Sequence, residues 1–126
     1  MRHYFAYHNA KKMKYSSTTI TEPHARTKKS IVGLEGVTVW LIAGEGTKSP
    51  KSFFISSMFI AEHCHTNKFT GDLPNEISGE GTLYKLTKPI TGTALMDQLK
   101  DKTANLRYFQ EIKDITIINS LLKLSL

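Results

Sequence analysis

The chain contains 126 residues, with 17 Lys and Arg against 11 Asp and Glu and a single cysteine. This length fits one domain of residues 1–126, and a hydrophobic content of 40% is too high for a disordered chain. A lone cysteine excludes a scaffold of internal disulfides. No apolar run approaches the roughly 20 residues of a membrane-spanning helix, and the first residues lack the apolar segment of a signal peptide. We therefore expect a basic, soluble, cytoplasmic domain that has no membrane partner.

The positive charge is concentrated in the first half of the chain. Residues 1–51 hold nine Lys and Arg but only three acidic residues, whereas residues 52–126 hold eight of each sign. Most of the excess lies between Lys11 and Lys29. A polyanion is the natural partner of such a segment, because neutralised phosphates release their counterions. The alternative is a basic loop that only aids solubility. The uneven distribution favours nucleic acid.

Three segments stand out in the first half of the chain. Aromatic and small residues alternate over Tyr4–His8, which is typical of a short strand. The polar stretch Asn9–Ser30 has neither a period of 2 nor one of 3.6, and therefore predicts a long loop with room for a helical turn. Val37–Ala43 is apolar and rich in β-branched residues, which predicts a strand buried on both faces.

The second half predicts further strands and two helices. Ser52–Ala61 predicts a long strand bulged at its two adjacent serines. A polar excursion follows over Cys64–Asn75, and then another strand over Glu80–Leu86. Apolar residues recur at helical spacing over Thr93–Lys100, and Asp114 can cap a second helix. The predicted fold is α+β: a small curled β-sheet or barrel with two or three packed helices.

The sequence carries no strong catalytic or cofactor motif. His63, Cys64 and His65 are adjacent, but a zinc site needs three or four converging ligands. On a strand, the two histidines would face away from the cysteine. The chain has neither a nucleophile elbow nor a phosphate-binding loop. We therefore predict a binding domain with no catalytic residue, no metal and no cofactor.

One weak signal keeps a catalytic alternative open. Glu111-Ile112-Lys113 matches half of a nuclease metal site, although no acidic strand precedes it. Triplets of this kind are common by chance. A small metal-dependent nuclease is therefore the less favoured alternative.

Aromatic residues flank the basic segment. Tyr4 and Tyr7 precede it, and Trp40, the single tryptophan, lies near the end of the predicted central strand. Stacking a base on such a ring contributes roughly 1–3 kcal/mol, and an aromatic pocket suits a methylated base. An isolated tryptophan in an apolar strand is also typical of a core residue. Both interpretations of Trp40 stay open at this point.

Four segments, read in order, are similar to a known family. They are YFAYHN at Tyr4–Asn9, GVTVWLIAGEG at Gly36–Gly46, GEGTLYKLTKPI at Gly79–Ile90 and LMDQLKDKTANLRYFQEIKD at Leu95–Asp114. Together they resemble the EVE-like domains of the PUA superfamily. These domains occur as specificity modules of modification-dependent restriction endonucleases and are relatives of the YTH readers. The resemblance implies a compact β-barrel that takes a modified base, flipped from its stack, into an aromatic pocket.

The resemblance also implies roles for residues of this chain. The base pocket would consist of Trp40, which stacks on the base, with Tyr7, Asn9, Ala43, Gly44 and Phe109. The nucleic-acid backbone would be held by Lys11, Lys12, Lys14, Arg26, Lys28, Lys29, Asn105 and Arg107.

The partner implied by the resemblance is double-stranded DNA that contains a methylated cytosine or adenine. In that family a separate nuclease domain cuts the DNA, so a fused or associated nuclease domain is a further expected partner. A PUA-like RNA-binding module, which would prefer RNA through its 2′-hydroxyls, is the main alternative. The sequence does not decide between DNA and RNA, and it does not identify the modification.

Overall fold

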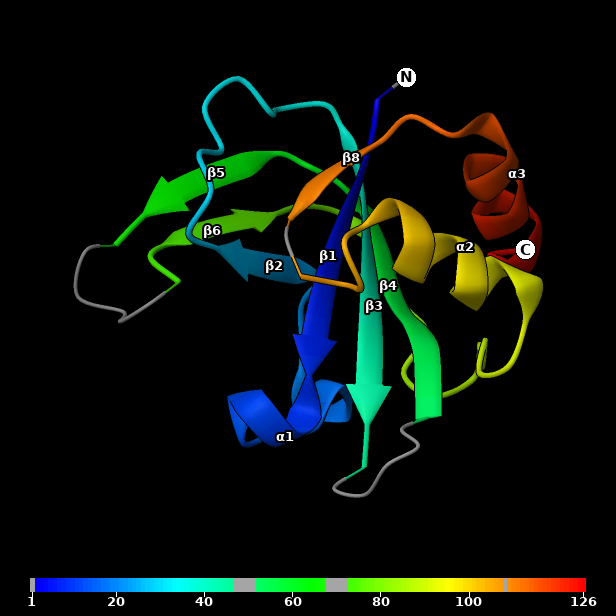
Figure 1. Cartoon of the computed structure of the whole chain (residues 1–126). Coiled ribbons are helices and arrows are strands. Elements are labelled where there is room, and N and C mark those ends of the chain that lie inside the picture. The colour runs from blue at the N-terminus through cyan, green and yellow to red at the C-terminus, as the bar shows by residue number, and fades with distance from the viewer. Residues whose placement is uncertain (1, 47–51, 68–72, 108) are drawn as a thin grey trace.

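The computed structural model describes residues 2–46, 52–67, 73–107 and 109–126, which form two β-sheets and three α-helices (Figure 1). The larger sheet has the strand order β7-β4-β3-β1-β8 and the smaller one β2-β6-β5. The larger sheet contains β1 (His3–Asn9), β3 (Thr38–Glu45), β4 (Ser52–Ile60), β7 (Gly81–Leu83) and β8 (Gln110–Ile112). The smaller sheet contains β2 (His24–Thr27), β5 (His63–Thr66) and β6 (Asn75–Ser78). The helices are α1 (Ala10–Met13), α2 (Ala94–Lys102) and α3 (Ile115–Leu124), and η1 (Ser17–Thr19) is a 3₁₀ turn.

The central strands β1 and β3 are parallel, with His3 opposite Thr38 and Asn9 opposite Gly44. A parallel pair needs a crossover connection, and the basic segment provides it with α1, η1 and β2. The helical turns α1 and η1 agree with the loop and helical turn predicted over Asn9–Ser30, whereas the strand β2 is not part of that prediction. These elements are three or four residues long, so none of them is long enough to produce a detectable period in the sequence.

Strand β3 lies at the centre of the core. Every residue from Thr38 to Gly44 is buried, because α2 and α3 cover one face of the larger sheet and the smaller sheet covers the other (Figure 1). Trp40 and Ile42 belong to the cluster on the helical side, and Val39 belongs to the cluster that includes residues of β2 and β6. The prediction of a strand buried on both faces is confirmed.

Strand β4 is bulged at its serines, as predicted. Leu41 lies opposite Ser57, whereas the next residue, Ile42, lies opposite Ile55. Ser56 is therefore the extra residue of the bulge. Both serines are buried, so the irregularity lies inside the core rather than at a solvated edge.

The largest difference from the sequence prediction is the β5–β6 pair. These antiparallel strands, with His63 opposite Ser78, replace much of the expected excursion over residues 64–75. Residues 68–72 of that excursion lie outside the described residues. The polar side chains of β5 are mostly exposed, so the strand has no apolar alternation to reveal it. Strand β7 spans Gly81–Leu83 and is shorter than the predicted Glu80–Leu86.

Both predicted helices of the second half are confirmed. The hydroxyl of Thr93 accepts a hydrogen bond from the Met96 amide at the start of α2. The carboxylate of Asp114 accepts from the Thr116 and Ile117 amides at the start of α3. Caps of this kind typically stabilise a helix by about 1 kcal/mol.

The α+β class is confirmed, with mixed sheets of five and three strands. The two sheets do not close into a barrel, so that more specific expectation is wrong. Among the described strands, β2, β5 and β6 pair only with one another and form a separate layer. Within the described ranges, no helix has the length and apolar character needed to cross a bilayer.

Candidate functional site

A cavity of about 940 Å³ lies beside the second half of β1. Strand β8 pairs with β1 only from His3 to Phe5, so beyond Phe5 the edge of β1 borders the cavity instead of a strand. The segment that links α2 to β8 passes in front of β1 (Figure 1). The described lining comes from five segments: Ala6, Tyr7 and Asn9; Lys12, Met13 and Tyr15; Arg26, Thr27, Lys28 and Lys29; Leu73; and Asn105, Leu106, Arg107 and Phe109.

Two aromatic pairs flank the small side chain of Ala6. On one side, the ring of Phe109 stacks on Tyr4 with centroids 5.2 Å apart. On the other side, the ring of Tyr15 lies 4.9 Å from that of His8. Tyr4, Ala6 and His8 alternate along β1 and therefore share one face of the strand. Phe109 and Tyr15 thus give the cavity two aromatic walls, and Ala6 leaves room between them.

The described lining is cationic. Five of its residues are Lys or Arg, and none is Asp or Glu: Lys12, Arg26, Lys28, Lys29 and Arg107. They come from α1, β2, the segment after β2 and the α2–β8 segment, so the fold collects charges that are far apart in sequence. Low-dielectric walls around charges of one sign raise the local concentration of an opposite charge. The charges of the described lining therefore favour an anionic ligand.

The cations differ in what already binds them. Arg26 forms an ion pair with Glu76 of the neighbouring strand, with N and O atoms 2.7 Å apart. Lys12, Lys28 and Arg107 are exposed and form no ion pair within the described part of the chain. These three side chains are therefore available to an external anion, whereas Arg26 also holds β2 against β6.

The basic crossover is fastened to the sheet by one carboxylate. Glu45, at the end of β3, accepts hydrogen bonds from the Ser16 hydroxyl, the Ser17 amide and the Ser17 hydroxyl. The Asn9 side chain caps α1 by accepting from the Lys12 amide. The hydrogen bonds to the Glu45 carboxylate are charge-assisted and therefore stronger than neutral ones. The segment that carries Lys12 and Tyr15 is thus held in a defined place.

A left-handed loop carries the opposite side of the cavity. Ala104, Asn105 and Leu106 all have φ values between 50° and 67°, a conformation that costs L-residues roughly 1–2 kcal/mol each. The buried hydroxyl of Thr103 stabilises it by donating to the Leu99 carbonyl and accepting from the Leu106 amide. Strained backbone of this kind often occurs at functional sites. In this chain the left-handed loop brings Asn105, which belongs to it, and Arg107, which follows it, to the lining of the cavity.

Most of the predicted site residues meet at this cavity. Its lining includes nine of them: Tyr7, Asn9, Lys12, Arg26, Lys28, Lys29, Asn105, Arg107 and Phe109. Lys11 and Lys14 are exposed on and just after α1 but do not line it. The structure thus divides the predicted basic residues into an inner set and an outer pair.

The predicted role of Trp40 does not fit its position. Its side chain is 0% exposed within the helical-side core, and its indole N–H donates to Nδ1 of His3 at 3.0 Å. No face of the ring is open to a base. The alternative of a core residue is the one that agrees with the structure.

The predicted roles of Ala43 and Gly44 in the base pocket also do not fit their positions. Both lie within β3, paired with β1 on one side and with β4 on the other, so their main chain is engaged in the sheet. Gly44 has a packing role instead, because a Cβ there would collide with the phenol of Tyr7. Burial raises the pKa of that phenol above its usual value, and the nearby Glu45 adds to the effect.

Sequence reasoning missed six described lining residues: Ala6, Met13, Tyr15, Thr27, Leu73 and Leu106. The alternation over Tyr4–His8 does carry a usable signal, since it places one small residue between two large ones on the same face of a strand. Nothing in the sequence indicates that the ring of Tyr15 returns to His8, because that contact depends on how Glu45 holds the crossover.

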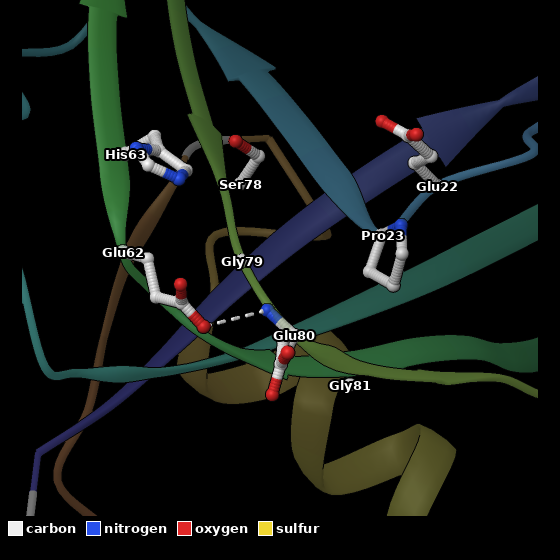
Figure 2. A pocket seen from close by; sticks show the side chains of 8 residues that line it. All are labelled: Glu22, Pro23, Glu62, His63, Ser78, Gly79, Glu80 and Gly81. Atoms are coloured by element: carbon white, nitrogen blue, oxygen red, sulfur yellow. Dashed lines mark hydrogen bonds between the residues drawn. The ribbon is translucent and has the colours of Figure 1, made fainter.

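Two smaller hollows, of about 570 Å³ and about 450 Å³, share no described lining residue with this cavity or with each other. The 570 Å³ hollow lies at the other end of β2 and is lined by Glu22, Pro23, Glu62, His63, Ser78, Gly79, Glu80 and Gly81. Figure 2 shows Glu22 across this hollow from Glu62, whose carboxylate accepts a hydrogen bond from the Glu80 amide at 3.2 Å. Its acidic side chains do not converge on one point.

The 450 Å³ hollow contains the residues of the nuclease alternative, Glu111 and Lys113. Glu111 is bound to Arg2 at 3.2 Å, and the hydrogen bond from Arg2 lowers the pKa of its carboxyl. The second acid of this hollow, Asp114, caps α3. Among the described residues, no three His, Cys, Asp or Glu side chains are placed to hold a metal ion.

Comparisons of this chain with protein-family models, with curated proteins and with solved structures find no match.

Proposed function

We propose that this chain binds nucleic acid and holds one base in the cavity beside β1. The observation that carries the proposal is the lining itself, in which five cationic residues surround aromatic walls and no described residue is acidic. Phosphates favour the cations, and the flat faces of bases favour the rings. A volume of about 940 Å³ lies within the range of small-molecule sites and has room for a nucleotide.

The roles follow from the positions of the side chains. Phe109 and Tyr15 stack on the base, in place of the buried Trp40. Lys12, Lys28 and Arg107, which form no ion pair within the described ranges, contact the phosphates on either side. Phosphate contacts position a nucleic acid without reading its sequence, whereas contacts to the base edge give selectivity.

The resemblance to EVE-like domains makes the proposal more specific. On that basis the strand is DNA, the base is a methylated cytosine or adenine, and it reaches the cavity by flipping out of its stack. Cutting would belong to a fused or associated nuclease domain. The separate three-stranded layer differs from the closed PUA-like barrel, so this part of the proposal depends on the sequence segments rather than on the sheet.

The test is binding to matched oligonucleotides at two salt concentrations. The probes are DNA duplexes that are unmodified, contain 5-methylcytosine or contain N6-methyladenine, together with an abasic duplex and an RNA of the same sequence. We expect a preference for one modified duplex that persists at higher salt, and weaker binding to the abasic duplex. A preference for the RNA would instead favour the RNA-binding alternative.

The matching variant is Phe109→Ala. Loss of a stacked ring removes roughly 1–3 kcal/mol, so binding to the preferred duplex should weaken by about tenfold while binding to the abasic duplex stays unchanged. Equal weakening for both probes would show that Phe109 supports the fold rather than the base. Equal, salt-sensitive binding of the unchanged protein to all probes would refute a base pocket.

A further inference from the structure

The edge of β1 changes its partner halfway along the strand. From His3 to Phe5 it pairs with β8, with Phe5 opposite Gln110. Phe109 is no longer in a strand, and the register with β8 does not extend to Tyr7. The remainder of this edge lies along the cavity.

The pairing of β1 with β3 fixes the direction of its main-chain groups. The Arg2 carbonyl accepts a hydrogen bond from the Thr38 amide. Since main-chain groups alternate in direction along a strand, those of Ala6 and His8 also face β3, and those of Tyr7 face the opposite edge. Within the described ranges, no residue pairs with the main chain of Tyr7 on that edge.

The cavity lies at this edge. Ala6 and Tyr7 point their side chains to opposite faces of the strand, yet both line the cavity. A hollow that contacts both must lie beside the strand rather than over one face. The N–H and C=O of Tyr7 therefore face it together, as one donor and one acceptor side by side. A main-chain pair of this kind needs a partner, from water or from a ligand.

We infer that the main-chain N–H and C=O of Tyr7 bind the edge of the base. This inference deepens the proposed function and depends on it. The base takes the place that the next strand of the sheet would take, with the rings of Phe109 and Tyr15 on the side of its plane that Ala6 faces. The matching base edge has an exocyclic N–H beside a ring nitrogen, as adenine and cytosine have. One methyl group on that amine leaves an N–H to donate, and two methyl groups leave none.

The first experiment measures amide hydrogen exchange in the free protein. The amides of Ala6 and His8, which face β3, are internal controls and should exchange slowly. The Tyr7 amide should exchange at least about tenfold faster than either. If Tyr7 is as protected as its neighbours, its edge already has a partner and the inference is wrong. This result does not depend on whether the protein binds nucleic acid.

The second experiment compares single-stranded DNA probes that contain one central adenine derivative. N6-ethyladenine and N6,N6-dimethyladenine are isomers of the same size, but only the first keeps an N–H. Single strands avoid the difference that dimethylation makes to base pairing. We expect the dimethyl probe to bind about tenfold more weakly, and the ethyl probe to slow exchange of the Tyr7 amide. A cytosine pair, N4-ethyl and N4,N4-dimethyl, serves if cytosine is the preferred base.

The possible failures are distinguishable. If neither isomer nor any other probe binds, the proposed function is wrong and this inference falls with it. If the probes bind but the two isomers bind equally, or the Tyr7 amide is unaffected, the proposed function stands and the inference is overturned. Tyr7→Phe keeps the main chain, so it should retain the difference between the isomers.

Discussion

The two ends of β2 lie in opposite electrostatic environments. At its C-terminal end, Arg26 and Lys28 border the cavity, whose described lining has no acid. At its N-terminal end, Glu22 borders the hollow of Figure 2, together with Glu62 and Glu80. The strand itself is four residues long, which corresponds to about 13 Å. The net charge of +6 is therefore not distributed evenly over the surface. The charges attract an anion to one end of this strand and repel it from the other.

We expect the largest change in DNA binding when positive charge is removed from the cavity at the C-terminal end of β2. We expect Lys12→Gln with Lys28→Gln to weaken DNA binding by at least about tenfold and to reduce the salt slope by nearly two, since each phosphate contact contributes about 0.9. The matched control is Lys11→Gln with Lys14→Gln, which removes the same charge outside the cavity. Titrations at several salt concentrations measure both. Equal losses in the two double variants would mean that only the total charge matters.

A smaller effect is expected on the stability of the fold that holds the two ends of β2 in place. Burial lowers the pKa of His3 below its usual value of 6.5, because the ring is enclosed beside Trp40. A histidine with a lowered pKa in the folded state costs stability below pH 6.5, where the unfolded chain binds the proton more readily. The free energy of unfolding should therefore fall from pH 6.5 downward, by at most about 1.4 kcal/mol per pH unit.

Chemical denaturation between pH 5 and 7.5 tests this pH dependence. With His3→Gln, the free energy of unfolding should depend less on pH in this range. The substitution also weakens the hydrogen bond that residue 3 accepts from the Trp40 indole. A slope that is the same with and without His3 would contradict the assignment.

Removing the ion-pair partner of Arg26 should increase the difference in charge between the two ends of β2. Glu76→Gln removes the carboxylate that binds this guanidinium and adds a fourth available cation to Lys12, Lys28 and Arg107. We expect binding to tighten by about two- to fivefold, with a salt slope steeper by at most about 0.9. Isothermal titration at two salt concentrations measures the change. Weaker binding would show that the ion pair is needed to hold β2 in place.

The smallest effect is expected from the acidic hollow. Glu62→Gln with Glu80→Gln removes two negative charges from the distant end of β2. At physiological ionic strength the Debye length is about 8 Å, so DNA binding should tighten by less than about twofold and the change should vanish at higher salt. This pair is also the control for Glu76→Gln. A larger change would mean that DNA reaches the hollow itself.

The parts of the fold that could be predicted are those with a local cause. The apolar run over β3 identifies a strand buried on both faces, and Asp114 identifies the start of α3. The β5–β6 pair and β2 could not be predicted in this way, because His63–Thr66 and His24–Thr27 are short and polar. Their position depends on pairing with one another, which is a tertiary effect.

The same distinction applies to the site. Charge alone identified Lys12 and Lys28 but could not separate them from Lys11 and Lys14, since a single turn of helix decides which side chains face the cavity. Trp40 is the opposite case. Its residue type suits base stacking, but its strand lies between two layers, and burial on both faces excludes that role.

The anchoring of Ser16 and Ser17 by Glu45 has a consequence for how fast a ligand is captured. A basic segment that became ordered only on contact would give a large negative heat-capacity change and a slow step after the first encounter. Here the ordering of the crossover takes place during folding. Association should therefore include no step in which the crossover becomes ordered. Its rate should rise as salt is lowered, and selectivity among ligands should appear in how long each complex lasts.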